Sequence, residues 1–328
     1  MSGPKVKLAT CLLNISEARN KVLVNDIIRA AKTAIESNRK PRAAVLNAFV
    51  DLEYNRSVIT IAGHLEDLET AVVDASKAAF EEIDMQIHEG GHPRLGAVDL
   101  IPIHPITEET SLEDCGAVAT NISRKLVRAV HGSSFFFFGH ADKQKRGLIQ
   151  RRKEIGWFDN RKAKNYPIIP DCGKFDPRFG ITGVGAAPYM SNFNISLDTQ
   201  DMAVGVKVLK NIRERSDGLV GVSGMAFPHA GGIEVACNVD MFQLDRAKEF
   251  HLKHLEAGTI EIVMGSFWRT KFKVIEEVVE RVSGTMGVKV IGESVIIGFT
   301  PEKARELTLK AIRDQKSSIV TTISSTIM

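Results

Sequence analysis

The sequence of 328 residues predicts an α+β (mixed α/β) protein with two similar halves. Apolar runs of strand length alternate with amphipathic helical patterns. The order strand-helix-strand-strand-helix-strand occurs before residue 104 and again after residue 188, and a basic, irregular segment separates the two occurrences. Because this order is that of the ferredoxin-like βαββαβ unit, we expect two ferredoxin-like subdomains, 1–178 and 179–328, with a ligand groove between them.

The first half begins with a strand and a helix. The apolar run Val6–Ile15 has the length of a strand, and Ser16 is the expected N-cap of a helix that reaches about Ser37. The elements expected next are two strands joined by a turn, an amphipathic helix and a fourth strand, over Arg42–Phe49, Arg56–Ala62, Leu65–Ile83 and Ala97–Ile103.

The middle of the chain continues with a helix over Leu112–Val130 and a strand over Ser133–Phe138. Four consecutive phenylalanines, Phe135–Phe138, predict that this strand is buried on both faces. The segment Lys143–Arg178 is rich in lysine, arginine, glycine and proline, which predicts a basic helix followed by a long irregular connection. Connections of this length in a compact protein are usually functional.

The second half repeats the pattern of strands and helices. A closing helix is expected from Pro301, because Thr300 and Pro301 stand in the order of an N-cap and a first helical residue. The elements before it are a strand, a helix, two strands, a helix and a strand, over Tyr189–Leu197, Val204–Ile212, Leu219–Phe227, Gly232–Val239, Lys271–Val282 and Val288–Gly298.

Composition excludes several classes of protein. The sequence is 44% hydrophobic and 25% charged, as in ordinary soluble proteins, and its net charge of +3 is too small to indicate nucleic-acid binding. No apolar run is long enough to span a membrane, and the N-terminus lacks the apolar region of a signal peptide. Four cysteines without C-x-x-C spacing indicate reduced thiols. We therefore expect a cytoplasmic protein with no nucleic-acid or membrane partner.

The segment Gly90–Asp99 predicts an active-site loop. It places one histidine, one arginine and one carboxylate among three glycines and a proline. Glycine lets the backbone approach a ligand closely, and imidazole is the side chain best suited to transfer a proton near neutral pH. His92 is therefore the first candidate for a catalytic residue.

The same segment offers a metal-site alternative. His88-Glu89-Gly90-Gly91-His92 matches the H-E-x-x-H pattern, which binds zinc when a helix places both imidazoles on one face. Two glycines and the following Pro93 disfavour a helix here. We therefore expect no metal, and a metal-dependent hydrolase that uses His88, Glu89 and His92 is the less favoured hypothesis.

Five segments, in order along nearly the whole chain, resemble the formiminotransferase domain, the N-terminal part of formimidoyltransferase-cyclodeaminase. The most specific is Gly91–Asp99, which is similar to the family's E-H-P-R-M-G-A-L-D. The other segments are Asn14-Ile15-Ser16-Glu17, Val50-Asp51 with Asn55-Arg56, Pro170–Gly180 and Phe193-Asn194-Ile195. We expect a stand-alone homologue that lacks the cyclodeaminase domain.

This resemblance implies a folate-dependent enzyme of one-carbon metabolism and histidine degradation. Such an enzyme transfers the formimino group of N-formimino-L-glutamate to tetrahydrofolate, its co-substrate, and forms a homodimer. By resemblance, His92 is the catalytic base that accepts a proton from the folate nitrogen, and Asp51 orients the imidazole or stabilises the developing positive charge. Arg94 would bind a carboxylate of formiminoglutamate or of the folate tail, and Asn14 and Asn194 would bind the pterin.

Further folate contacts follow from the resemblance, each with a structural alternative. Asp51 is also a common turn residue, and Arg56 could pair with a neighbouring carboxylate. The basic run Lys143–Lys153 could line a channel for the folate tail or form a solvated helix face. The additional positions implied as folate contacts are Glu17, Arg56, Gly173, Lys174, Phe175, Pro177, Arg178, Phe179 and Gly180.

One departure from the family leaves a second function open. The family has Gly-Ala-Arg-Lys before its F-N-I strand, whereas this chain has Gly185-Ala186-Ala187-Pro188. Two cationic residues that could bind a carboxylate are therefore missing, and Lys174 and Arg178 are the candidates to replace their charge. The alternative is a non-catalytic folate-binding protein that keeps the fold but has lost the site for the amino-acid donor.

Overall fold

The computed structural model describes residues 6–156, 169–243, 258–319 and 323–325. It consists of two compact units, 1–187 together with 303–327, and 188–302. Each unit packs helices against β-sheet, so the predicted α+β class is confirmed. The subdomain boundary after residue 178 stays a prediction. Within the described ranges, no helix is long and apolar enough to cross a membrane.

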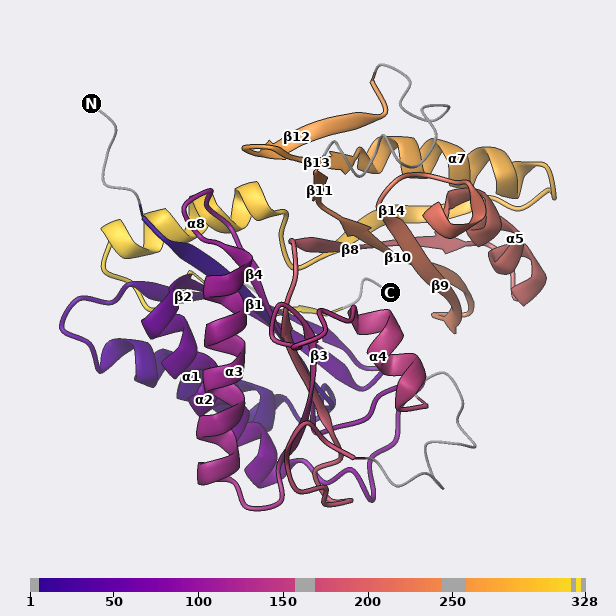
Figure 1. The fold of residues 1–328 in the computed structure, drawn as a ribbon. Coiled ribbons are helices and arrows are strands. Elements are labelled where there is room, and N and C mark those ends of the chain that lie inside the picture. Colours follow the sequence, from indigo (N-terminus) through magenta and orange to yellow (C-terminus); the bar gives the residue numbers. More distant parts are fainter. Residues whose placement is uncertain (1–5, 157–168, 244–257, 320–322, 326–328) are drawn as a thin grey trace, which may run out of the picture. The chain divides into compact units, whose positions relative to one another are not determined.

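The first four strands of the first unit form an antiparallel sheet in the order β2-β3-β1-β4. Two helices, α1 and α2, lie side by side against it (Figure 1). All eight residues of β1 are buried between two neighbouring strands, which explains its continuous apolar run. These six elements are β1 (Leu8–Ile15), α1 (Lys21–Glu36), β2 (Ala43–Asp51), β3 (Arg56–His64), α2 (Leu65–Glu82) and β4 (Val98–Pro105).

Helix α1 begins later than the sequence predicts. Its N-cap is Asn20, whose side chain accepts a hydrogen bond from Leu23 N at 3.1 Å. The predicted N-cap, Ser16, is wrong because its hydroxyl donates to the Gly96 carbonyl at 2.7 Å and its backbone N–H to the Ala97 carbonyl at 2.8 Å. Ser16 thus ties the end of β1 to the segment that enters β4.

Further strands extend this sheet to the order β15-β2-β3-β1-β4-β7-β5-β6. Helix α3 lies next to α2, and it begins with a capping box in which Ser111 and Asp114 bind each other's backbone N–H groups. The added elements are α3 (Leu112–Ala129), β5 (Ser134–Gly139), α4 (Leu148–Glu154), β6 (Cys172–Gly173), β7 (Thr182–Ala186) and β15 (Ile323–Ser325).

The phenylalanine strand β5 contributes to two apolar clusters, as its sequence predicts. Phe135 packs in the main core, whereas Phe136 and Phe138 pack in a second cluster that includes Leu148 of α4. Strand β7, beside β5, was not predicted because its glycines hide the strand pattern. A Cβ on Gly183 would lie 2.6 Å from Phe136 Cζ, so the phenylalanine rings occupy the space that side chains of β7 would need.

Apart from the 3₁₀ turn η1 and the strands β11–β13, the described elements of the second unit follow the order of the first six elements. Its four-stranded sheet has the order β14-β8-β10-β9. A separate sheet, β11-β13-β12, was not predicted. Helix α8 (Pro301–Arg313) begins at Pro301 as expected. The remaining elements are β8 (Met190–Leu197), α5 (Met202–Ile212), the 3₁₀ turn η1 (Glu214–Ser216), β9 (Val222–His229), β10 (Gly232–Asp240), β11 (Phe242–Gln243), β12 (Ile260–Met264), β13 (Phe267–Thr270), α7 (Phe272–Gly284) and β14 (Val290–Ile297).

Candidate active site

The loop between α2 and β4 carries His92 and is held in place by Arg94. The Arg94 guanidinium donates to the Tyr54 carbonyl at 2.6 Å and to the Asn55 carbonyl at 3.0 Å. It also donates twice to the carbonyl of His92, at 2.6 and 2.8 Å. Arg94 therefore fastens the histidine loop to the turn between β2 and β3.

The imidazole of His92 has a defined tautomer. Its Nδ1 lies 2.7 Å from the carbonyl of Pro93, and because a carbonyl only accepts, Nδ1 carries the proton. The lone pair is then on Nε2. Arg56 Nη1 lies 3.0 Å from Nδ1 and 3.1 Å from Nε2, so its guanidinium is in contact with both ring nitrogens. The ring of Tyr54 meets the imidazole edge-on, with 5.2 Å between the ring centroids.

Arg56, at the start of β3, connects three parts of the site. Its Nη1 contacts His92, and its Nη2 donates a short hydrogen bond to Asn14 Oδ1 on β1. The Asn14 side chain is fixed in turn, because its Nδ2 donates to the Leu12 carbonyl at 2.7 Å. Nη2 of Arg56 also lies 3.8 Å from Asp99 Oδ2 on β4, beyond hydrogen-bonding distance.

Asp99 is the buried carboxylate between two guanidiniums. Its Oδ1 accepts the backbone N–H of Leu95 at 2.9 Å, whereas Oδ2 has no hydrogen bond to any residue that the structure describes. Oδ2 faces Arg56 and, at 3.6 Å, the guanidinium of Arg152 from helix α4. The Asp99 side chain is only 3% exposed, so its charge acts in a poorly solvated environment.

Burial and positive charge set the protonation states here. Burial lowers the pKa of His92 well below 6.5, and the nearby charges of Arg56, Arg152 and Arg94 lower it further. Burial also lowers the pKa of Arg56, and it lowers those of Arg94 and Arg152 to about 10. At neutral pH the site therefore holds an uncharged imidazole among three charged guanidiniums.

The predicted site residues Asp51 and Glu17 make local backbone contacts. Asp51 Oδ1 accepts the N–H of Tyr54 at 2.8 Å, which closes the turn after β2. Asn55 completes this turn with a φ of +48° and donates to the Glu89 carbonyl at 2.9 Å. Glu17 Oε1 accepts three backbone N–H groups, of residues 18–20, at 2.7 to 2.9 Å. Catalytic or folate-binding roles for Asp51 and Glu17 stay predictions.

The C-terminal end of the predicted folate loop, residues 173–180, is hydrogen-bonded to the end of the histidine loop. The N–H of Ala97 donates to the Phe179 carbonyl at 2.9 Å, and a β-bridge links Gly180 to Gly96. Gly180 is needed because its φ is +67° and a Cβ would lie 1.9 Å from the Leu95 carbonyl oxygen. Arg178 at this end donates to the Glu81 carbonyl of α2 at 2.8 Å.

The other residues of this loop differ in exposure. Phe179 is buried and meets Phe80 edge-on at 5.5 Å, so it belongs to the core. Phe175 is 36% exposed, and Lys174 is also exposed. The backbone of Gly173 has a φ of +83° and pairs with β5, and Pro177 is exposed. Contacts of these loop residues with folate stay predictions.

The final predicted residue, Asn194, lies in the second unit. It is half-buried on β8, opposite Ala236 of β10 on one side and Val295 of β14 on the other. The neighbouring Asn192 donates to Asn238 Oδ1 at 2.6 Å. The role of Asn194 in pterin binding stays a prediction.

The basic run of helix α4 is partly neutralised by carboxylates. Arg146 contacts Asp142 at 2.8 Å, and Arg151 contacts Glu154 at 2.5 Å and Asp171 at 2.7 Å. These arginines brace α4 against the surrounding chain. Nothing in the sequence singles out Arg152, which is one cation in a run of several. Its approach to Asp99, at 3.6 Å, becomes visible only in the fold.

The H-E-x-x-H segment lies in a loop and not on a helix, as its glycines predict. His88 contacts the guanidinium of Arg94 at 3.0 Å, and His92 contacts that of Arg56, so both imidazoles face cations. Across the described part of the chain, no group of three histidine, cysteine, aspartate or glutamate side chains is placed to hold a metal ion.

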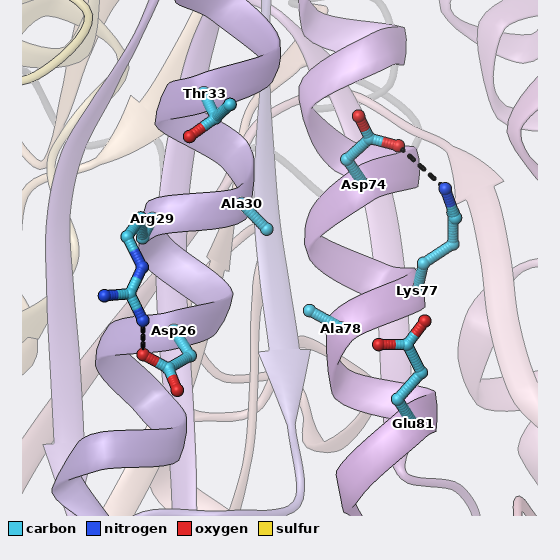
Figure 2. A pocket seen from close by; sticks show the side chains of 8 residues that line it. All are labelled: Asp26, Arg29, Ala30, Thr33, Asp74, Lys77, Ala78 and Glu81. Carbon is cyan, nitrogen blue, oxygen red and sulfur yellow. Dashed lines mark hydrogen bonds and ion pairs between the residues drawn. The ribbon is translucent and has the colours of Figure 1, made fainter.

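A charged surface groove lies between α1 and α2, with a cavity volume of about 380 Å³ (Figure 2). Arg29 pairs with Asp26 and Lys77 with Asp74, each along its own helix. None of the predicted site residues lines this groove. Its lining consists of Asp26, Arg29, Ala30, Thr33, Asp74, Lys77, Ala78 and Glu81.

Comparison with known proteins identifies the family. The model of the formiminotransferase domain, N-terminal subdomain, matches residues 8–187, which include His92 and the residues described around it: Asn14, Tyr54, Arg56, Arg94, Asp99 and Arg152. The chain belongs to the formiminotransferase family. The predicted resemblance is thereby confirmed.

Three relatives of this formiminotransferase homologue show how far the similarity extends. A formiminotransferase cyclodeaminase-like protein of Arabidopsis thaliana is 33% identical over 250 residues, which cover 71% of this chain and 82% of that protein. The glutamate formimidoyltransferases of Streptococcus pyogenes serotype M1 and Thermoplasma acidophilum are 29% and 27% identical. Both of these matches cover 91% of this chain and 90% of the relative.

Proposed function

We propose that this chain transfers a formimino group from N-formimino-L-glutamate to tetrahydrofolate, with His92 as the general base. The observation that supports this most directly is the uncharged imidazole of His92, oriented by the Pro93 carbonyl in a loop fixed by Arg94. Two relatives that align over 91% of the chain are named glutamate formimidoyltransferase.

The proposed reaction exchanges one C–N bond for another. A bond forms between N5 of tetrahydrofolate and the formimino carbon, the bond from that carbon to the glutamate nitrogen breaks, and the proton lost from N5 ends on the glutamate amine. His92 would take this proton at Nε2 and return it to the leaving nitrogen, so the enzyme ends in its starting state. The Pro93 carbonyl keeps Nδ1 protonated and so keeps the lone pair on Nε2.

The cationic surroundings of His92 suit anionic substrates. Arg56, Arg94 and Arg152 all oppose protonation of the imidazole in the unliganded protein. Both formiminoglutamate and the folate tail carry carboxylates, which would offset this positive charge and make His92 a stronger base. Carboxylate binding by Arg94, pterin binding by Asn14 and Asn194, and orientation of His92 by Asp51 are parts of this proposal.

We extend the proposal to the organisation of the protein. The same strand order, with the fourth strand beside the first, occurs in both four-strand sets, which supports two ferredoxin-like subdomains. A folate groove between them, a homodimer and a place in histidine degradation follow from the family resemblance. Free cysteines at positions 11, 115, 172 and 237 support a cytoplasmic location.

The test is formation of 5-formiminotetrahydrofolate by the purified protein, with tetrahydrofolate binding followed by calorimetry in the same samples. His92→Gln should reduce turnover by about 10²- to 10⁴-fold and leave tetrahydrofolate binding nearly unchanged. His131→Gln, at an exposed position after α3, is the matched control. Turnover by His92→Gln at the wild-type rate would contradict a role for His92 as the base.

A second candidate, folate binding without catalysis, is favoured by one observation. Ala187 and Pro188 stand where the family has a cationic pair, so the donor has two fewer positive charges to bind. Binding of tetrahydrofolate without product, at any concentration of N-formimino-L-glutamate, would support this candidate and exclude the transferase.

A further inference from the structure

In this structure Arg56 lies against the ring nitrogen that His92 would use as a base. His92 has two ring nitrogens, and Nδ1 is bound to the Pro93 carbonyl. Arg56 Nη1 lies 3.0 Å from Nδ1 and 3.1 Å from Nε2, so a cation is in contact with both ring nitrogens. A proton taken up at Nε2 would lie against this guanidinium, so Arg56 has to move away first.

Arg56 has one donor, Nε, that nothing in the described structure uses. Its Nε is buried and has no hydrogen-bond partner among the residues that the structure describes. A buried donor without a hydrogen-bond partner lowers the stability of the folded protein, so it indicates that an acceptor is missing. The edge formed by Nε and a terminal nitrogen is the fork that binds a carboxylate with two parallel hydrogen bonds.

The charges around Arg56 identify the missing acceptor as an anion. Arg56 and Arg152 both lie within 4 Å of Asp99, at 3.8 and 3.6 Å, and neither distance is a hydrogen bond. The side chains of Arg56 and Arg152 are 16% and 14% exposed, so solvent reaches them only in part. Arg94 adds a third, half-buried guanidinium close to His92, so a ligand that binds here would meet a cationic site.

We propose that a carboxylate of the ligand binds the Nε edge of Arg56 and draws its guanidinium off His92, so that carboxylate binding uncovers the base. Arg152, beside Asp99, would hold the second side of the same anion. This inference rests on the proposed function for the use of His92 as a base. The carboxylate comes from the amino-acid donor or from the folate tail, and two probes distinguish them.

The experiment follows the imidazole of His92 directly. Protein carrying ¹⁵N in its histidine rings is titrated with L-glutamate, which represents the donor, and with p-aminobenzoyl-L-glutamate, which represents the folate tail. His92→Gln assigns the His92 signals. We expect one probe to move the Nε2 resonance toward the position that it has in Arg56→Met, and the dimethyl ester of glutamate, which lacks carboxylates, to have no effect.

Variants at position 56 separate this inference from a structural role. Arg56→Met has no donor, so its Nε2 resonance should differ from that of the unliganded wild type and stay unchanged on titration. Calorimetry should show a Kd for the active probe that is raised about tenfold or more. Arg56→Lys keeps the charge without the fork and should respond partially. Arg42→Met is the control, because Arg42 lies at the opposite end of the β2–β3 hairpin and pairs with Asp67.

The outcomes are decisive in both directions. An equal shift in wild type and Arg56→Met, or no shift with either probe up to its solubility limit, overturns the inference. A carboxylate-dependent shift in a protein that forms no 5-formiminotetrahydrofolate leaves the inference standing and removes only the proposed function. Turnover without any shift removes only the inference.

Discussion

Arg94 holds the carbonyl of His92 with two hydrogen bonds, from Nε at 2.8 Å and from Nη2 at 2.6 Å. The same guanidinium reaches the carbonyls of Tyr54 and Asn55 in the turn after β2. The position of the imidazole thus depends on a contact between two loops that are about 40 residues apart in the sequence. Arg94 is placed to position the histidine loop whether or not it also binds a carboxylate.

Replacement of Arg94 tests these two roles. Arg94→Gln should lower the free energy of unfolding by about 3 kcal/mol, because several carbonyl groups lose a charged donor. Urea unfolding measures this, and Arg313→Gln, which loses one exposed ion pair to Asp314, should change it by less than about 1 kcal/mol. Unchanged stability with a raised KM for formiminoglutamate would instead show that Arg94 serves the substrate alone.

The two glycines before His92 differ in what they tolerate. A Cβ on Gly90 would lie 2.3 Å from the Tyr54 carbonyl oxygen and 2.4 Å from Arg94 Nη2, whereas one on Gly91 would meet only ordinary contacts at 3.7 and 3.8 Å. Gly90→Ala should therefore displace the loop and reduce turnover at least about tenfold, while Gly91→Ala should behave as wild type. Comparable turnover in the two variants would contradict this packing. The family's glutamate at position 91 fits the open space there.

Sequence patterns predicted the parts of the fold that follow from local periodicity. The continuous apolar run of β1 and the amphipathic pattern of α2 gave elements close to those observed. Strand β7 was not predicted, because its glycines are required by the phenylalanine rings of the neighbouring strand, which leave no space for larger side chains. Local strand preference does not reveal such a requirement. The N-cap of α1 was misplaced, because Ser16 binds Gly96, 80 residues away.

The candidate site was predictable where its residues share one segment. His92, Arg94 and Asp99 stand within eight positions, and the histidine loop was chosen from that segment. The contact of Arg56 with His92 depends on the pairing of β2 with β3, and the approach of Arg152 to Asp99 depends on how α4 packs. Neither contact produces a pattern of residue spacing by which the sequence alone would predict it.

Stability should depend on pH through three half-buried histidines. The pKa values of His92, His88 and His64 are all lowered in the folded protein, mainly by burial, whereas in the unfolded chain they are near 6.5. Between each lowered pKa and about 6.5 the unfolded state binds more protons, so the free energy of unfolding falls as the pH falls below about 6.5.

This loss should reach at most about 1.4 kcal/mol per pH unit for each histidine, measured by urea unfolding between pH 7.5 and 5. His92→Gln removes one of the titrating groups, and its stability should decline less steeply. If the wild type and His92→Gln proteins lost stability with identical slopes, His92 would have an ordinary pKa in the folded state.

The four thiols should differ in reactivity, because only the thiolate is nucleophilic. Burial raises the pKa of Cys115 and Cys237 to about 12 and raises that of Cys11 as well, whereas Cys172 is half-buried next to β5. Ellman's reagent should therefore label one thiol per chain in the native protein and four after unfolding. Cys172→Ser should abolish the native labelling and Cys115→Ser should not. Rapid reaction of more than one thiol under native conditions would mean that the core of the first or second unit opens far more readily than its packing indicates.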